Sequence, residues 1–505
     1  MLRPTRSLPV SLMKLVVTPQ RPKEMMALKV EPPGTALTGW LLRKMMSSTV
    51  SPIPITFRIA IICLTTAKVQ NFLILFVFYS FIFRNFATIM TKYNTTTLAN
   101  GLRVIHMSSA SPVVYCGIGI NAGSRQEAEC EEGLAHYCEH TTFKGTQRRS
   151  SLQILNCLET VGGDLNAFTN KEDTVFYAAI LREHLNKAVD LLFDIVFNST
   201  YPAEELRHEA DVICDEIESY NDSPAELIYD EFENLIFEGH PLGHNILGLR
   251  ERVMAFTTQD ALRFTSRHYR PDNAIFFIYG DVDFNRLIKM LELRSKKIEM
   301  REMLNNDMLV HAPSSIAQSS PLTVEKSTSS TEAHHQAHVM VGSRTFGYKD
   351  PRRLPLYLLN NLLGGPGMNA RLNLSLRERH GLVYTVESSM ATYSDTGCWC
   401  VYFGCDHDDV RRCLRLVWNE LNRLVQQPLS ERQLIAAKRQ LKGQIAIACD
   451  NREQFALDFA KHFLHYGHER SIEELLQQID DLTAAQLQDV AQQVFTLDRL
   501  QHLIL

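Results

Sequence analysis

Residues 133–146 read GLAHYCEHTTFKGT and hold two histidines and a glutamate in the order H-x-x-E-H. His136 and His140 are four residues apart, so on a helix their rings lie on one face, one turn apart. Glu139 follows His136 by three residues and shares that face. Imidazole pairs with this spacing bind zinc, and a neighbouring carboxylate can take a proton from a zinc-activated water. The order is the inverse of the H-E-x-x-H zinc-peptidase motif. The stretch therefore predicts a helix that carries a metal centre.

Five matching letters also arise by chance on a surface helix with two solvated histidines and a glutamate. The neighbours Leu134, Ala135 and Phe143 are apolar, which predicts that the motif is half-buried. Unpaired buried charge is costly, and a bound metal ion removes that cost. The flanking residues thus favour a metal site over a solvated helix face.

A third protein ligand is expected on a helix over residues 204–220, EELRHEADVICDEIESY. Glu209 and Glu216 are seven residues apart, two helical turns, so they share a face. Val212 and Ile213 lie between them and predict that this face points inward. A catalytic zinc usually has three protein ligands and one water, so Glu216 is the predicted third ligand. Glu209 is the predicted supporting acid that orients a ligand. The alternative is that both are solvated helix acids.

The first 89 residues differ from the rest of the chain. They hold 11 Lys and Arg against 2 Glu, whereas the remainder holds 41 basic and 55 acidic residues. An acidic main body argues against nucleic acid as a partner, because phosphate binding needs clustered Lys and Arg.

Residues 72–83, FLILFVFYSFIF, form an apolar run of 12 residues. A membrane span needs about 20 residues, and the apolar region of a signal peptide about 7–15. Three interpretations stay open: translated upstream sequence with the working protein beginning at Met90, a membrane anchor, or a cleaved signal. We expect a cytoplasmic protein, with membrane anchoring or export through this run as the alternative. Membrane contact is expected only if the extension is part of the native protein.

From Met90 onward the pattern is that of a folded protein. A strand, then Gly-Ser-Arg, then a helix occurs at Gly123 and again at Gly342, which suggests two related α/β domains. We expect domains at 90–295 and 336–505, joined by a Ser-, Thr- and Pro-rich linker at 296–335. The expected elements are strands near 96–108 (with a turn at Asn100-Gly101), 113–121, 165–169, 174–181, 273–282 and 337–341, and helices near 150–161, 183–198 and 203–219.

The 11 cysteines are scattered through apolar runs and form no C-x-x-C pair, which predicts buried free thiols. Cys398 and Cys400 lie two apart on an expected strand and so share a face. We interpret them as packing residues and not as a metal site.

The run GLAHYCEHTTFKGT, with Glu216 located 76 positions after His140, resembles the pitrilysin/insulinase family, which includes the mitochondrial processing peptidase and its bacterial relatives. The resemblance covers residues 90–505. It implies an α+β fold of two related domains, each a mostly antiparallel sheet packed with helices, forming half of a clamshell. It also implies a zinc endopeptidase acting on short or unfolded peptides, with one Zn²⁺ per chain. The implied roles are His136, His140 and Glu216 as ligands, Glu139 as general base and Glu209 as supporting acid.

Two further patches match the family. Residues 162–169, GGDLNAFT, resemble its substrate-binding edge strand, which implies peptide contacts at Asn166, Ala167 and Phe168. The alternative is a glycine turn before a core strand. Residues 377–384, RERHGLVY, resemble its second-domain patch, in which Arg377 and Tyr384 reach the substrate from the opposite half.

The chain has one half-length unit, so the resemblance implies a homodimer or a heterodimer with a related subunit. The alternatives are a non-catalytic partner or scaffold subunit of a processing-peptidase-like complex, and a membrane-tethered assembly factor. The complete five-residue set argues against the non-catalytic subunit.

Overall fold

The computed structural model describes residues 93–296, 298, 323–325 and 336–505, and these belong to one compact unit. The run 72–83 lies outside the described residues, so the predictions about the extension and the compartment stay predictions. No helix in the described part of the chain is both long and apolar enough to cross a membrane.

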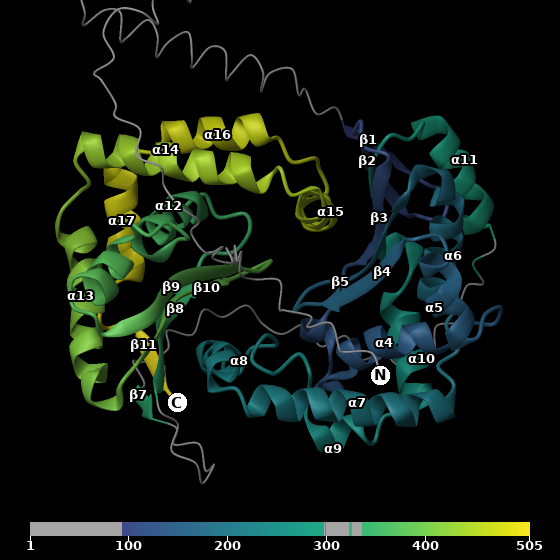
Figure 1. The fold of residues 1–505 in the computed structure, drawn as a ribbon, viewed down its shortest axis with the longest axis horizontal. Helices are drawn as coiled ribbons and strands as arrows, with labels where there is room; N and C mark the ends of the chain where they lie inside the picture. Colours follow the sequence, from purple (N-terminus) through teal and green to yellow (C-terminus); the bar gives the residue numbers. More distant parts are fainter. Residues whose placement is uncertain (1–92, 297, 299–322, 326–335) are drawn as a thin grey trace, which may run out of the picture. The chain divides into compact units, whose positions relative to one another are not determined.

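The first half is built on a sheet with the strand order β1-β2-β6-β3-β5-β4. Its strands are β1 (Tyr93–Thr97), β2 (Arg103–Met107), β3 (Val113–Ile120), β4 (Asp164–Thr169), β5 (Thr174–Leu181) and β6 (Ala274–Tyr279). All neighbours pair antiparallel except β2 and β6, which are parallel. The predicted mostly antiparallel sheet is confirmed, and β4 lies at its edge (Figure 1).

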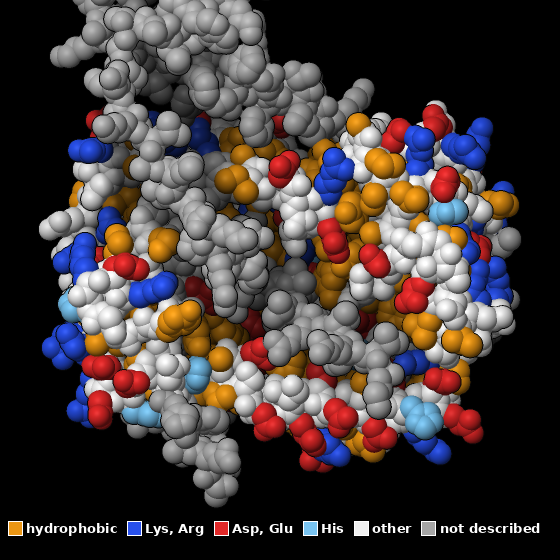
Figure 2. All heavy atoms as spheres, in the orientation of Figure 1, with side chains coloured by type: hydrophobic (Ala, Val, Ile, Leu, Met, Phe, Trp, Pro, Cys, Tyr) orange, Lys and Arg blue, Asp and Glu red, His pale blue; other side chains and the backbone are white. Residues whose placement is uncertain are grey.

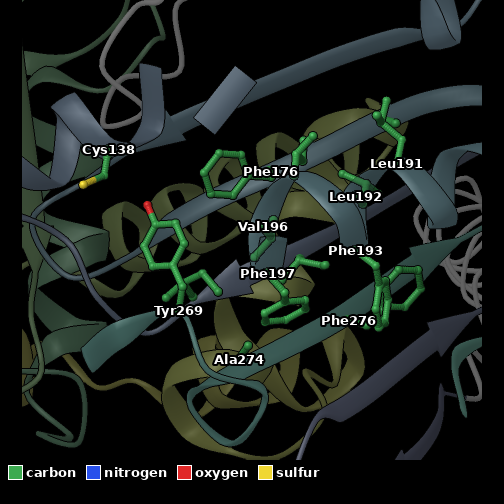
Figure 3. Close-up of a cluster of buried hydrophobic side chains, with 14 of the residues drawn as sticks. Cys138, Phe176, Leu191, Leu192, Phe193, Val196, Phe197, Tyr269, Ala274 and Phe276 are labelled. Carbon is green, nitrogen blue, oxygen red and sulfur yellow. The ribbon is translucent and has the colours of Figure 1, made fainter. Parts of the chain in front are cut away.

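One face of this sheet is covered by helices of the first half. They are α4 (Leu134–Thr141), α5 (Ser151–Glu159), α6 (Leu185–Asn198), α7 (Ala203–Asn221), α8 (Pro224–Ile236), α9 (Arg250–Val253), α10 (Thr258–His268) and α11 (Phe284–Ser295). The described helix α8 does not contribute to the first-half hydrophobic core, whereas α9 contributes Val253. Figure 3 shows Phe193 and Phe197 of α6 in one buried cluster with Phe176 of β5 and Phe276 of β6. Cys138 of α4 belongs to the same core, so the metal-motif helix is fixed by packing on its apolar side.

The second half repeats this plan on a sheet with the order β7-β11-β8-β10-β9. Its strands are β7 (Thr323–Glu325), β8 (Ala337–Thr345), β9 (Val383–Thr392), β10 (Gly397–Cys405) and β11 (Gln501–Ile504). Its helices are α12 (Arg353–Gly364), α13 (Val410–Gln426), α14 (Glu431–Ala448), α15 (Arg452–Tyr466), α16 (Ile472–Asp481) and α17 (Ala484–Val494). Strand β7 falls within the stretch predicted as a linker.

The two halves are related by topology. In both, the strand after the first long helical region is an edge strand that turns back through a four-residue turn: Thr169 pairs with Thr174, and Thr392 with Gly397. The predicted relation between the domains is therefore confirmed. The two Gly-Ser-Arg triplets are not equivalent, however. When the two turns are aligned, the pairing registers make Gly342 of β8 equivalent to Gly117 of β3 and not to Gly123.

In each half, one helix packs against the sheet of the other half (Figure 1). Helix α15 packs on the first sheet, where Phe455 and Phe459 are buried with Ile275 and Phe277. Helix α8 packs on the second sheet, where Phe232 is buried among residues of β8, β10 and β11. This exchange makes the interface between the halves part of the hydrophobic core.

None of the ten cysteines of the described part of the chain forms a disulfide, as predicted. Seven of them are buried, but Cys130 is exposed and Cys157 and Cys449 are partly exposed, so the prediction of burial was wrong for these three. Cys398 and Cys400 are buried in the cluster formed around α8, which confirms their packing role.

Candidate metal centre

Helix α4 begins at a defined point because its first N–H groups are bonded to a buried carboxylate. Glu127 accepts hydrogen bonds from the backbone N–H groups of Gly133 (3.0 Å) and Ala135 (2.6 Å). His244 contacts the same carboxylate through Nε2 at 3.0 Å. Gly133 has φ of +94°, and a Cβ there would lie 2.8 Å from Gly248 Cα. Glycine is therefore required at position 133. The start of the helix is fixed both by the hydrogen bonds to Glu127 and by the close packing of Gly133 against Gly248.

The three predicted ligands converge. The Nε2 atoms of His136 and His140 lie 3.8 and 3.6 Å from the same oxygen, Oε2 of Glu216. One donor atom from each of the three residues lies within 4.8 Å of the others. Ligands about 2.1 Å from a tetrahedral zinc ion lie roughly 3.4 Å apart. The donor set and its spacing therefore fit a zinc ion.

The protonation state of His136 also fits. Burial, followed by the neighbouring His140, lowers the pKa of His136, which keeps its imidazole neutral. The neutral ring is the form that binds a metal. Among the described residues His136 Nδ1 has no hydrogen-bond partner, whereas Nε2 faces the other two donors.

Glu209 supports His140 as predicted for an orienting acid. His140 Nδ1 lies 3.1 Å from Glu209 Oε1, and the other carboxylate oxygen pairs with Lys144. Burial acts to raise the pKa of Glu209, but hydrogen bonds from His140 and Lys144 outweigh it and hold the pKa below its usual value. The bond at Nδ1 leaves His140 Nε2 free to face Glu216.

Helix α7 presents two faces. Glu209 and Ile213 are buried, whereas Val212 is 51% exposed, so the prediction that Val212 marks the inward face was wrong. At 3.6 residues per turn Val212 lies about 60° from Glu209, on the side away from Ile213. Figure 2 shows acidic side chains gathered along α7. The exposed acids of this solvated face are Glu204, Asp211, Asp215 and Glu218.

Glu139 lies beside the three donors without belonging to their group. Its Oε2 accepts a hydrogen bond of 2.8 Å from Thr169 Oγ1 at the end of β4. Burial, the largest influence, raises the pKa of Glu139, while His140 and Thr169 act to lower it. A carboxylate with a raised pKa near a metal site is suited to accept and release a proton.

Strand β4 carries Asn166, Ala167 and Phe168 and pairs on one side with β5. Its other edge is not paired with any described strand. Asn166 is exposed, while Ala167 and Phe168 are partly buried. The edge position agrees with the expectation from the resemblance, and peptide binding there stays a proposal.

Arg377 and Tyr384 lie in the second half. The Arg377 guanidinium lies over the Tyr384 ring, 5.6 Å from its centroid, and Tyr384 is 80% exposed. Arg377 lines a cavity of about 640 Å³. Within the described chain no hydrogen bond or ion pair joins Arg377 or Tyr384 to the three donor residues. The fold brings the three predicted zinc ligands together, but it does not place Arg377 or Tyr384 in contact with them.

Sequence reasoning missed Glu127, Lys144 and Thr169. Thr169 directly follows Asn166-Ala167-Phe168, and its β-strand alternation with Ala167 places both on the face toward α4. That alternation could have indicated a contact with the motif helix. Glu127 carried no such signal, because its partners depend on the path of the loop before α4.

Comparisons with known proteins show the family of the chain. Over residues 103–249 the chain matches the family described as insulinase (peptidase family M16), and over residues 255–441 the peptidase M16 inactive domain. It is 31% identical over 404 residues to an uncharacterized zinc protease of Mycobacterium leprae, covering 79% of this chain and 88% of the relative. It is 29% identical over 403 residues to the uncharacterized zinc protease YmxG of Bacillus subtilis, covering 80% and 95%.

Solved structures share the fold. A protease from Helicobacter pylori superposes with a TM-score of 0.74 at 22% identity, covering 82% of this chain and 99% of that one. A peptidase M16 inactive domain structure from Pseudomonas fluorescens gives a TM-score of 0.71 at 20% identity, covering 82% and 98%. Two sheets of matching topology, the His-His-Glu group on α4 and α7, and these matches lead to one conclusion: the chain belongs to the insulinase family, peptidase family M16.

Proposed function

We propose that the chain is a zinc-dependent endopeptidase that hydrolyses peptide bonds in short or unfolded peptides. The observation that carries this proposal is the separation of roles around α4. His136, His140 and Glu216 converge on one point, and Glu139 lies beside them, held by Thr169 and not by the donor group.

In this proposal His136, His140 and Glu216 hold one zinc ion per chain. When bound, zinc supplies Lewis acidity, which acidifies a water molecule and polarises a carbonyl group. Glu139 takes the proton from the attacking water and passes it to the leaving amine. Glu209 keeps the His140 ring in the orientation and tautomer that ligation needs.

The substrate would bind in extended form along β4. The edge of this strand that pairs with no described strand offers backbone N–H and C=O groups, so a peptide can add as a further strand with Asn166, Ala167 and Phe168 beside it. Main-chain recognition of this kind needs an unfolded segment, which is why we expect short or unfolded peptides as substrates.

We further propose that the working form is a dimer, either of two copies or with a related subunit. Arg377 and Tyr384 of one chain would face the zinc residues of the other and stabilise the oxyanion that forms on the substrate carbonyl. A non-catalytic partner or scaffold is the alternative, and the complete set of ligands and base argues against it.

The test is hydrolysis by the full-length chain with a Glu139→Gln variant beside it. A tryptic digest of β-casein serves as the peptide mixture, and mass spectrometry identifies the cleaved peptides. We expect one zinc per chain in both proteins, and a loss of about 10²–10⁴-fold in cleavage rate for Glu139→Gln. Cleavage by the variant at the wild-type rate, or loss of its zinc, would reject the assigned roles.

A further inference from the structure

Thr169 is the last residue of β4, on the face of the strand that looks toward α4. Leu165 and Ala167, on the same side of the strand by alternation, pack against the first-half core. Phe168 points to the opposite face, where its ring packs against Tyr177. The strand thus gives Thr169 an orientation fixed by the packing of its neighbours.

The contact of Thr169 with Glu139 is directional. Thr169 Oγ1 donates to Glu139 Oε2 at 2.8 Å, and among the described residues it is the one that donates a hydrogen bond to this carboxylate. Glu139 is 8% exposed, so little water is available to replace the bond. A glutamate side chain has three rotatable bonds, and a single donor at one oxygen selects one of its orientations.

The turn that follows Thr169 is anchored by buried charges. Lys171, Glu172 and Asp173 are consecutive and only 3%, 5% and 1% exposed. Lys171 Nζ donates to the carbonyl oxygens of Leu242 (3.2 Å) and His244.

The other two charges of the turn bind the second half. Glu172 accepts hydrogen bonds from the Ser394 backbone N–H at 3.0 Å and from Ser394 Oγ at 2.6 Å. Asp173 pairs with Lys461 at 3.1 Å and with His465 at 3.0 Å, both on α15. A turn with three compensated buried charges cannot shift without leaving one of them unpaired, which is costly.

From this arrangement we propose that Thr169 is a positioning residue for the general base: its hydroxyl holds Glu139 Oε2, so that Oε1 is the oxygen presented to the reacting water. The inference rests on the proposed function. In the proton transfer the water O–H bond breaks, the proton joins Oε1, and the Thr169 hydroxyl keeps its own proton throughout.

The experiment compares Thr169→Val, which keeps the shape and removes the donor, with Thr169→Ser, which keeps the donor. One peptide of the casein digest that the wild-type chain cleaves is synthesised with a fluorophore and a quencher, and kcat and KM are measured separately. We expect kcat of Thr169→Val to fall about 10–100-fold, the factor of a hydrogen bond to a charged group, with KM and zinc content unchanged. Thr169→Ser should recover most of kcat.

Thr392 gives a matched control, because it ends β9 at the register position that Thr169 has in β4. Thr392→Val should leave kcat unchanged. If Thr169→Val is poorly folded by circular dichroism, Thr169→Ala removes the same donor with less bulk and takes its place.

Three results would overturn the inference: wild-type kcat in Thr169→Val, loss of zinc in that variant, or equal kcat in the Ser and Val variants. The Glu139→Gln chain, assayed with the same peptide, distinguishes a failure of the proposed function from a failure of the positioning role of Thr169. If Glu139→Gln is active, the proposed function fails. If Glu139→Gln is inactive while Thr169→Val is fully active, the positioning role alone fails.

Discussion

The two halves of the molecule arrange corresponding helices and strands around an equivalent position in each fold, but the side chains at the two positions differ. In the first half α4, β4 and α7 surround His136, His140 and Glu216. In the second half α12, β9 and α14 occupy the corresponding places in the order of elements, and they line the cavity of about 640 Å³. On the two helices the lining holds the amides Asn360, Asn361 and Gln444 together with Tyr357, and β9 adds Glu387.

This difference separates what the fold supplies from what the residues supply. A helix beside an edge strand, crossed by a second helix, occurs twice. Amide side chains are neutral and offer no imidazole nitrogen or carboxylate, which are the zinc ligands of such centres. The topology therefore provides a position for a site, and the choice of side chains on α4 and α7 decides whether a metal binds there.

The largest effect is expected from removing a predicted zinc ligand of the first half, with a histidine of the second half removed separately as the control. His140→Ala should lower the zinc content from one per chain to none and reduce peptide cleavage by at least about 10²–10⁴-fold, the loss expected without the base. His338 of β8, whose Nδ1 lies 2.9 Å from Tyr402 Oη, gives the control. His338→Ala should keep one zinc per chain, measured by atomic emission. A half-equivalent of zinc in both variants would show that metal binding is shared between the halves.

Much of the first half could be predicted because its signals are local. The Asn100-Gly101 turn is present, with Gly101 at φ of +88°, and the predicted strands and helices agree with the observed ones to within a few residues. The motif helix and the shared face of Glu209 and Glu216 were predicted from helical periodicity, and both carboxylates lie near His140. These features depend on residues close in sequence, where backbone geometry leaves few options.

The exchange of α8 and α15 could not be predicted from the sequence. An amphipathic pattern indicates that a helix has a buried face, but it does not indicate which sheet that face covers. The same limit applies to Glu172 and Ser394, which are 222 residues apart and meet because two hairpin turns lie together. The prediction that Val212 lies on the inward face of α7 was wrong for a related reason, because an apolar residue on a helix is not always on its buried face.

The exchanged helices predict equal losses of stability in the two halves. Phe459 of α15 and Phe232 of α8 are each 1% exposed, and replacing a buried phenylalanine with alanine costs about 3–5 kcal/mol. We expect Phe459→Ala and Phe232→Ala to lower the free energy of unfolding by similar amounts, each in a single urea transition followed by fluorescence and circular dichroism at fixed zinc concentration. Leu152→Ala, at a residue 69% exposed, is the control and should change it little. Two separate transitions would mean that the halves are independent.

The proposed dimer predicts that the second half of one chain completes the site of another. Arg377→Ala should cost about 10²–10³-fold in kcat, the loss of one oxyanion donor. After subunit exchange, an equal mixture of Arg377→Ala and Glu139→Gln chains should regain about a quarter of the wild-type activity, because half of the dimers are mixed and each of these has one intact site. An inactive mixture with confirmed exchange, or an active monomer by light scattering, would contradict the arrangement.

The smallest effect concerns the pH dependence of the contact between the halves. Burial acts to raise the pKa of Asp173, but Lys461 and His465 outweigh it and hold the pKa well below its usual range. A carboxyl group with a lowered pKa stabilises the fold above its unfolded pKa of about 3.9, and this contribution is lost as the pH falls toward the folded value.

Asp173→Asn should therefore destabilise the chain by about 2 kcal/mol at pH 7, below the 3–5 kcal/mol of a fully buried pair because Lys461 is 39% exposed. The difference from wild type should shrink below about pH 4, as measured by urea unfolding at several pH values. Asp281→Asn, which breaks the exposed pair with Arg182, should cost less than about 1 kcal/mol at either pH. A constant difference from pH 7 to pH 3.5 would exclude Asp173 as the titrating group.

The position of α15 in the chain also bears on how the protein is made. Strand β6 ends at Tyr279, but the helix that covers it ends at Tyr466, so 187 further residues must be synthesised first. At about 5–20 residues per second, this leaves the apolar surface of Ile275 and Phe277 without its partner for roughly 10–40 s. An uncovered sheet face is a site of aggregation during that interval. The nascent chain is therefore expected to need a chaperone until the ribosome has released α15.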